Sequence, residues 1–407
     1  MSDLSTVGAA AVVDRPARPR AALPALCLTQ ITSWGIVYYA FPVLNPQITA
    51  ATGWSAATTT AAFSAALLVS ALAGIRIGRI LDARGPRTVM TAGSVIGTAS
   101  LVVIAMAPNP AVFTVGWLLA GLAMASTFYQ PAFAALTRWW SPHHIRALTT
   151  VTLAGGLAST FFAPLTAQLA EHFTWRHTYL ILAAVLAAVT VPAHAFALRG
   201  PWPPAPPSTT AGATSTTATI TRSRPFLLLA TALTLSSFAM YAVVVTLVPL
   251  LLDRGYTATQ AAWALGLGGA GQTLGRTLYA ALARRTSPAL RAAVLVGLGG
   301  ATTAAFALVP GPYPLLAVLA VVAGTVRGNL TLLQATAITD RWGANRYGRL
   351  SGLLAAPTTT ASALAPFAGT ALAVPLGGYP HLFVVLALVS ATAALIARHT
   401  TPDDLTT

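Results

Sequence analysis

The sequence contains no lysine and only eight acidic residues, and charged residues occupy 8% of its 407 positions. A soluble domain of this length needs a charged surface around its apolar core, and this chain has too little charge to cover one. Because 56% of the residues are hydrophobic, most of the surface must face lipid. At about 20 apolar residues for each span, the chain is long enough for about twelve transmembrane helices.

Cysteine is nearly absent as well, and the single Cys27 excludes an internal disulfide and a thiolate metal cluster. The spans that we expect contain neither a His–Glu pair nor a Cys–His group, as an intramembrane enzyme would need. The tails are too short for the output domain of a sensor. We therefore expect no enzymatic activity, no metal and no cofactor.

What the sequence does contain is arginine, and the arginines lie in alternate loops. These loops hold the groups around Arg20, Arg84, Arg138, Arg222, Arg285, Arg341 and Arg398. The loops between them hold only Arg176 and Arg254. An excess of positive charge marks cytoplasmic loops, so we expect a multi-pass protein of the cell membrane with both termini in the cytoplasm. The net charge of +15 then reports topology and does not indicate a nucleic-acid partner.

The apolar runs predict an all-α membrane protein of twelve spans. We place them at 22–48, 56–80, 88–107, 111–137, 147–170, 176–198, 225–251, 258–281, 289–309, 313–338, 348–374 and 380–398. Residues 199–224 are rich in Pro, Thr and Ser and predict a cytoplasmic linker. The linker separates two six-helix bundles, 22–198 and 225–398, which are flanked by cytoplasmic tails at 1–21 and 399–407.

The two halves repeat each other in order and nearly constant spacing. The segment from Gly74 to Asp82 recurs as Gly271 to Tyr279, and Arg138-Trp139 recurs as Arg341-Trp342. These motifs fall on the cytoplasmic side in both copies, so the halves are parallel repeats. A tyrosine stands in the second copy where the first has the Asp82 carboxylate.

A short charged stretch between the second and third spans resembles the cytoplasmic-loop signature of the major facilitator superfamily of transporters. The matching positions are Gly78, Asp82, Gly85 and Arg87, and the departures are Ala83 and Pro86, where the family usually has basic residues. The resemblance implies the fold of that family, with two parallel six-helix repeats and a site that opens alternately to either side. It also implies that this loop is a conformational latch, which a carboxylate among arginines can form and break. The alternative is a positive loop that only anchors topology.

Arg327 is the sharpest candidate for substrate binding, because charged residues inside a membrane are costly and usually functional. It lies thirteen residues from Asp340, which is about 20 Å along a helix and close to the bilayer midplane. Thr331 and Gln334 share its helix face. With no acidic partner at that depth, Arg327 is expected to bind an anionic substrate. The alternative is a structural arginine satisfied by backbone carbonyls.

A second polar stripe follows the first span through Gln30, Trp34 and Tyr38, and it indicates either an organic ligand or helix packing. Gln130 and Tyr241 complete the expected binding residues. Pro131 should kink the fourth span and free a carbonyl. Arg76 and Arg276 lie near expected helix ends, so we expect both to snorkel to the interface.

Together these features favour a secondary active transporter of a small organic anion, similar to the monocarboxylate and oxalate–formate group. Proton coupling and exchange both remain open. The alternative is an efflux pump for a drug or toxic compound. The fifth span of such pumps usually contains a Gly-Pro pair, and here Gly155, Gly156 and Pro164 are present without that pair.

Overall fold

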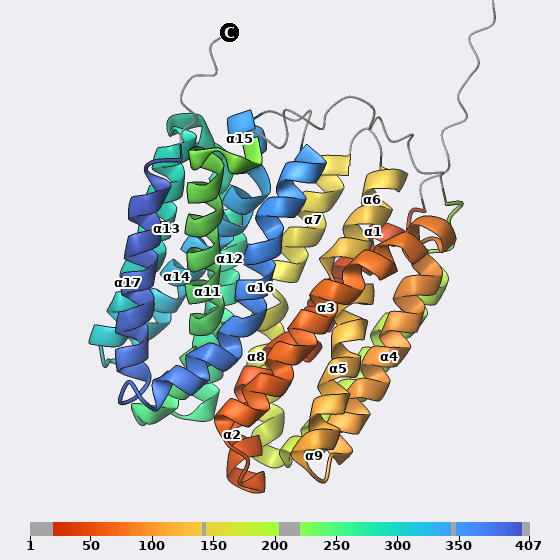
Figure 1. The fold of residues 1–407 in the computed structure, drawn as a ribbon. Helices are drawn as coiled ribbons and strands as arrows, with labels where there is room; N and C mark the ends of the chain where they lie inside the picture. Colours follow the sequence, from red (N-terminus) through yellow and green to blue (C-terminus); the bar gives the residue numbers. More distant parts are fainter. Residues whose placement is uncertain (1–18, 141–143, 203–219, 343–346, 401–407) are drawn as a thin grey trace, which may run out of the picture.

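The computed structural model describes residues 19–140, 144–202, 220–342 and 347–400. Within these residues the regular structure is helical throughout, and no strand is assigned (Figure 1). Nearly all of the expected N-terminal tail, most of the expected linker and most of the C-terminal tail lie outside the described residues.

The helices follow the expected spans, and several spans consist of two helices. In the first half they are α1 (Ala22–Ser33), the π-helix η1 (Trp34–Tyr39), α2 (Ala40–Thr52), α3 (Ala56–Arg84), α4 (Pro86–Met106), α5 (Pro110–Thr127), α6 (Tyr129–Trp139), α7 (His144–Gly156), α8 (Ala158–His172), α9 (Trp175–Pro192) and the π-helix η2 (Ala193–Ala197). In the second half they are α11 (Arg224–Asp253), α12 (Ala258–Arg285), α13 (Pro288–Leu308), α14 (Tyr313–Thr336), α15 (Thr339–Trp342), α16 (Tyr347–Ala373) and α17 (Tyr379–Ala397).

Nine helical segments of the described chain are long and apolar enough to cross a membrane, and three of them combine two consecutive helices, such as α5 with α6. The other three expected spans are α1–α2, α12 and α16, which are helical but less apolar. They carry polar side chains such as Gln30, Gln272 and Thr359 in their interiors. A helix that faces a polar cavity tolerates such residues, whereas in a helix surrounded by lipid they are energetically costly.

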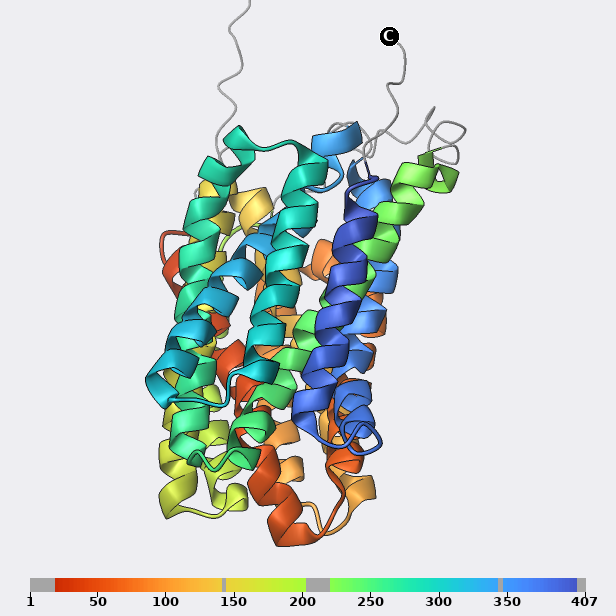
Figure 2. The ribbon, with the colours of Figure 1, turned by 90° about the vertical axis from the view of Figure 1, so that its left-hand side faces the viewer.

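The helices form two groups, which are red to yellow and green to blue in Figure 1. The groups meet along two long contacts, α3 against α16 and α8 against α12. At the lower end of Figure 1, α2 also packs against α11 and α12. In the view of Figure 2, α17 lies on the outer face of the second group. The α3–α4 turn at Gly85 and the short α15 lie at the other end, which we call the Gly85 end.

Proline explains a break in the fourth span. Pro131 has no N–H to donate to the carbonyl four residues earlier, and the helix is interrupted at Phe128, whose backbone is extended (φ −75°, ψ −160°). The carbonyl of Thr127 instead accepts a hydrogen bond of 2.6 Å from the side-chain amide of Gln30. The expectation that Pro131 frees a carbonyl is confirmed.

Among the described helices, α12 and α14 form the most extensive contact, and glycines make it possible. A methyl group added to Gly271 or Gly275 would lie 2.1 or 2.0 Å from a carbonyl oxygen of α14. One added to Gly324 or Gly328 would lie 2.0 or 2.1 Å from a carbonyl oxygen of α12. Each helix thus has two glycines four residues apart, which is the small-residue spacing that lets membrane helices touch backbone to backbone. We call this contact the glycine seam.

Replacing a seam glycine should separate the two helices. We expect Gly275→Ala and Gly324→Ala each to lower the melting temperature of the purified protein, because overpacking costs at least about 1–3 kcal/mol. The matched control is Gly352→Ala on α16, where an added methyl group would meet no atom within 4 Å. Equal melting temperatures for the seam variants and the control would contradict the close packing.

Candidate functional site

A cavity of about 120 Å³ lies between the two halves. Its lining residues come from both: Trp34, Tyr38, Tyr39, Tyr129 and Gly155 from the first half, and Met240, Tyr241, Val244, Gln272, Arg276, Arg327 and Thr331 from the second. We call it the central cavity. A second hollow of about 280 Å³ shares Trp34, Tyr38, Tyr129 and Tyr241 with it and continues to Gln130, Thr359 and Ser362.

Arg276 reaches the central cavity, so the expectation that it snorkels to the interface is wrong. Its helix continues for nine more residues to Arg285, about 13 Å at 1.5 Å per residue, so the loop is farther away than the sequence suggested. Arg276 is 8% exposed, and its Nη1 donates to the carbonyl of Thr152 in the other half. Arg76, in contrast, is exposed on α3 and does not line the cavity.

Arg327 lies beside Arg276 in the lining because the glycine seam joins their helices. Its Nη2 donates to Oε1 of Gln272 over 3.4 Å, a weak hydrogen bond to a neutral group. The described part of the chain has two ion pairs, Arg138–Asp82 and Arg291–Asp340, and both lie at the Gly85 end. No carboxylate is among the described residues that line the cavity. Two guanidinium groups therefore face one cavity without a counter-ion from its lining.

The aromatic residues add unsatisfied donors to this charge. Trp34 stacks on Phe128 with ring centroids 4.1 Å apart, and the rings of Tyr38 and Tyr241 approach to 6.5 Å across the two halves. Four buried polar atoms of the cavity lining have no hydrogen-bond partner within the described residues: Trp34 Nε1, Tyr38 Oη, Arg276 Nε and Arg327 Nε. Three can only donate, and the hydroxyl can donate. Such a set suits a ligand that accepts hydrogen bonds and carries negative charge.

The structure brings together six of the eight expected binding residues. Arg327 and Thr331 line the central cavity, Gln130 lines the adjoining hollow, and Trp34, Tyr38 and Tyr241 line both spaces. Gln30 and Gln334 line neither space. Gln30 is fully buried against Thr127, and Gln334 donates to Ser237 Oγ over 2.7 Å.

Several lining residues were missed in the sequence, and the polar ones are Tyr39, Tyr129, Gln272 and Arg276. Gln272 and Arg276 lie one helical turn apart on α12, next to Gly271 and Gly275. The glycine spacing was the available signal, because it marks the helix face that meets another helix.

Gln30 should therefore contribute to stability more than to binding. We expect Gln30→Leu to lower the melting temperature, because an unpaired buried carbonyl costs about 1–3 kcal/mol. Gln168→Leu on an exposed face is the matched control. A variant that keeps its melting temperature but loses transport would contradict this assignment and return Gln30 to the binding residues.

The expected latch residues lie at the Gly85 end. Among the described residues, their hydrogen-bond and ion-pair partners that are distant in sequence are Arg138 and Ala195 in the first half and Trp202 in the expected linker. Asp82 pairs with Arg138 at the end of α6, and the carbonyl of Asp82 accepts a hydrogen bond of 3.0 Å from Trp202 Nε1. The Arg138 guanidinium lies 4.4 Å from the centre of the Trp202 ring. Gly85 adopts φ +77°, which favours glycine and makes the turn into α4.

The other two latch residues differ in their contacts. Arg87 donates from Nε to the carbonyl of Ala195 in η2 over 2.9 Å, which ties the start of α4 to the end of the sixth span. An added methyl group at Gly78 would meet no atom within 4 Å. The structure therefore gives Gly78 no packing role in this conformation.

The second half has a comparable ion pair with the carboxylate on a different helix. Tyr279, which replaces Asp82 in the repeat, shares a hydrogen bond of 2.6 Å with Thr336. Thr336 in turn donates to Asp340 over 3.0 Å, and Asp340 pairs with Arg291 at the start of α13. The acidic residue is thus at the end of α3 in one half and next to α14 in the other.

The role of Asp82 is testable without unfolding the protein. The Asp82 side chain is 58% exposed, and a pair of this kind contributes only about 0–1 kcal/mol to stability. We expect Asp82→Asn to remain folded and to slow transport, since the amide loses the charge-assisted bond to Arg138. Asp253→Asn, at the opposite end, is the control. An unchanged uptake rate at equal expression would reduce Asp82 to an anchoring residue.

Comparison with known families gives a match over most of the chain. A sequence model described as the Major Facilitator Superfamily matches residues 26–354. Rat monocarboxylate transporter 13 is 27% identical over 360 residues, which cover 87% of this chain and 79% of that protein. An uncharacterized 38 kDa protein of Thermoproteus tenax is 30% identical over 154 residues. The chain spans 40% of the length of that relative and 31% of the Bacillus subtilis protein YcxA.

Solved structures show the same fold at low sequence identity. The nucleoside transporter NupG superposes with a TM-score of 0.74 at 14% identity, over 94% of this chain and 99% of that chain. A bacterial homolog of the human lysosomal transporter Spinster, in an inward-facing and unoccupied conformation, gives a TM-score of 0.72 at 16% identity. That match covers 94% of this chain and 97% of the Spinster homolog.

Proposed function

This chain belongs to the Major Facilitator Superfamily, and from that membership we propose that it is a secondary active transporter of a small organic anion. The observation that carries the proposal is that Arg276 and Arg327 line one cavity, and that its described lining residues include no carboxylate. A permanently charged guanidinium away from water needs an anion, and its fork of donors fits a carboxylate. In this proposal the substrate supplies the missing negative charge.

The identities of the relatives support the same substrate class. Three mammalian relatives are monocarboxylate transporters, and the match to one of them covers 87% of this chain. The unpaired donors of Trp34 and Tyr38 would complete the coordination of a carboxylate between the arginines. Tyr129, Tyr241 and Gln272 would line the rest of the central cavity around the bound carboxylate.

The contacts between the halves support alternating access. At the end opposite Gly85, Glu171 on α8 accepts a hydrogen bond from Thr259 on α12, and α2 packs against α11. At the Gly85 end, the latch residues bond within the first half and to Trp202 of the expected linker, and none of their described hydrogen bonds or ion pairs reaches the second half. This arrangement suits a conformation closed at the Glu171 end. From the arginine pattern we propose that the Gly85 end lies on the cytoplasmic side of the cell membrane.

The two halves would rock about the central cavity. The contacts of α3 with α16 and of α8 with α12 run between them, and Thr160 donates to the carbonyl of Gly266 across the second contact over 2.9 Å. In the opposite state the Glu171–Thr259 contact would open, and the latch would close against the second half. In this proposal the two bundles that move are the expected ones, 22–198 and 225–398.

Uptake by reconstituted protein tests the substrate class. We propose measuring a panel of labelled carboxylates in proteoliposomes with and without a pH gradient. Arg276→Gln and Arg327→Gln should each reduce uptake about 10- to 100-fold, the loss expected for a charged hydrogen bond. Arg327→Lys should retain part of the uptake, because it keeps the charge and loses the planar fork.

Arg76→Gln is the matched control, because Arg76 is exposed on α3 and lines neither space. Its uptake should equal that of the unsubstituted protein. Normal carboxylate uptake by folded Arg327→Gln and Arg276→Gln would overturn the anion site. An efflux pump with uncharged or cationic ligands would then be the better hypothesis.

A further inference from the structure

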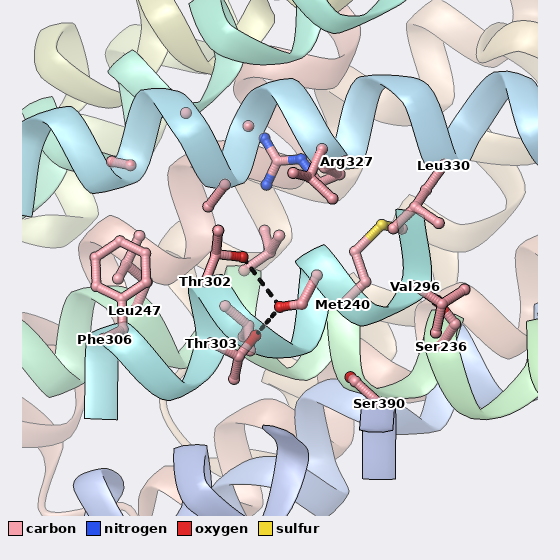
Figure 3. A pocket seen from close by; sticks show the side chains of 18 of the residues that line it. Ser236, Met240, Leu247, Val296, Thr302, Thr303, Phe306, Arg327, Leu330 and Ser390 are labelled. Carbon is pink, nitrogen blue, oxygen red and sulfur yellow. Dashed lines mark hydrogen bonds between the residues drawn. The ribbon is translucent and has the colours of Figure 1, made fainter. Parts of the chain in front are cut away.

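A separate cavity of about 60 Å³ lies inside the second half, on the other side of Arg327 (Figure 3). It is enclosed by α11, α12, α13, α14 and α17, and its walls include Leu247, Val296, Phe306 and Leu330. We call it the side pocket. Nothing in the transport cycle described above uses it.

The side pocket and the central cavity share part of their lining. Met240, Val244 and Arg327 line both spaces. Figure 3 shows Met240 and Arg327 extending into the side pocket from two different helices. Methionine has three rotatable bonds and adapts to the shape around it, so a rotation of Met240 can join the two spaces without moving the backbone.

The lining of the side pocket selects for apolar groups. The hydroxyls of Thr302 and Thr303 both donate to the carbonyl of Gly299, over 3.0 and 2.8 Å. The hydroxyl of Ser390 donates to Leu386 over 3.0 Å. These donors are already used, and Arg327 is the one charged residue among the residues described for the lining. A second carboxylate would lose its hydration there without compensation.

The volume also sets a limit. At about 15 Å³ for each water-sized group, a cavity of 60 Å³ has room for about four heavy atoms. A short alkyl chain or a small branched group fits, whereas a longer chain does not.

We propose that the side pocket receives the apolar tail of the anion whose carboxylate binds Arg276 and Arg327. Met240 is the residue that opens it. This inference rests on the proposed function and makes it more specific. The transporter should prefer monocarboxylates with tails of about three or four carbons, such as butyrate and isovalerate, over acetate, hexanoate and the dicarboxylate succinate.

A glycine pair on α13 provides the test. A methyl group added to Gly299 would lie 3.6 Å from Leu330 Cδ1 and 3.9 Å from Val326 Cγ1, so it enters the pocket without a clash. A methyl group added to Gly297 would lie 3.7 Å from Ala394 on α17 and outside the pocket lining. Gly299→Ala and Gly297→Ala therefore differ only in whether the added methyl group fills the pocket.

The measurement is the inhibition constant of acetate, butyrate, hexanoate and succinate against uptake of labelled butyrate. Gly299→Ala should raise the butyrate-to-acetate ratio of inhibition constants about fourfold, which is the effect of one methylene group. Gly297→Ala should leave the ratio unchanged. Val296→Ala enlarges the pocket and should lower the hexanoate-to-acetate ratio of inhibition constants. This second variant keeps the proposal testable if Gly299→Ala folds poorly.

The outcomes separate this inference from the proposed function. If carboxylates inhibit and the two glycine variants give the same ratio, with Val296→Ala unchanged, the side pocket does not bind the tail and the anion site stands. If no carboxylate inhibits and Arg327→Gln matches the unsubstituted protein, the anion site and the side pocket both fail.

Discussion

The backbone contact between α12 and α14 determines where the two arginines of the central cavity lie. Four glycines let the two helices touch, and each helix carries one arginine of the central cavity. Two cations that line one cavity repel each other, so their position depends on packing that holds the helices together. The Gln272 side chain and the Thr152 carbonyl contribute hydrogen bonds, but neither neutralises charge. The seam thus maintains an arrangement that electrostatics alone would oppose.

The cavity and the helix ends deal with arginine in different ways. At the Gly85 end, Arg138 and Arg291 each have a carboxylate partner from a neighbouring helix. In the cavity, the arginines meet aromatic rings, an amide and a backbone carbonyl. An ion pair within the protein would compete with an anionic ligand, whereas neutral partners leave the charge available. This contrast distinguishes the structural arginines from those proposed to bind substrate.

The fold could be predicted from the sequence. The apolar runs indicate the spans, the alternate arginine-rich loops indicate their orientation, and the Gly78–Arg87 motif indicates the family. Arg327 was found because a charge in the middle of an apolar run is conspicuous. Arg276 was misjudged because its distance from a loop depends on where α12 ends, and helix ends are poorly defined in sequence. Gln30 was assigned to the ligand because its partner, the Thr127 carbonyl, is distant in sequence and becomes free only through Pro131.

The use of arginine in the central cavity also has an electrical consequence. Arginine keeps its proton at every physiological pH, so the two guanidinium groups cannot carry a proton across the membrane, and a co-transported proton would have to travel elsewhere. The unoccupied site keeps two positive charges, and a bound monocarboxylate leaves one. A membrane potential acts with about 2.3 kcal/mol per charge for each 100 mV. In the proposed cycle, voltage therefore acts more strongly on the return of the empty carrier than on the step that moves the substrate.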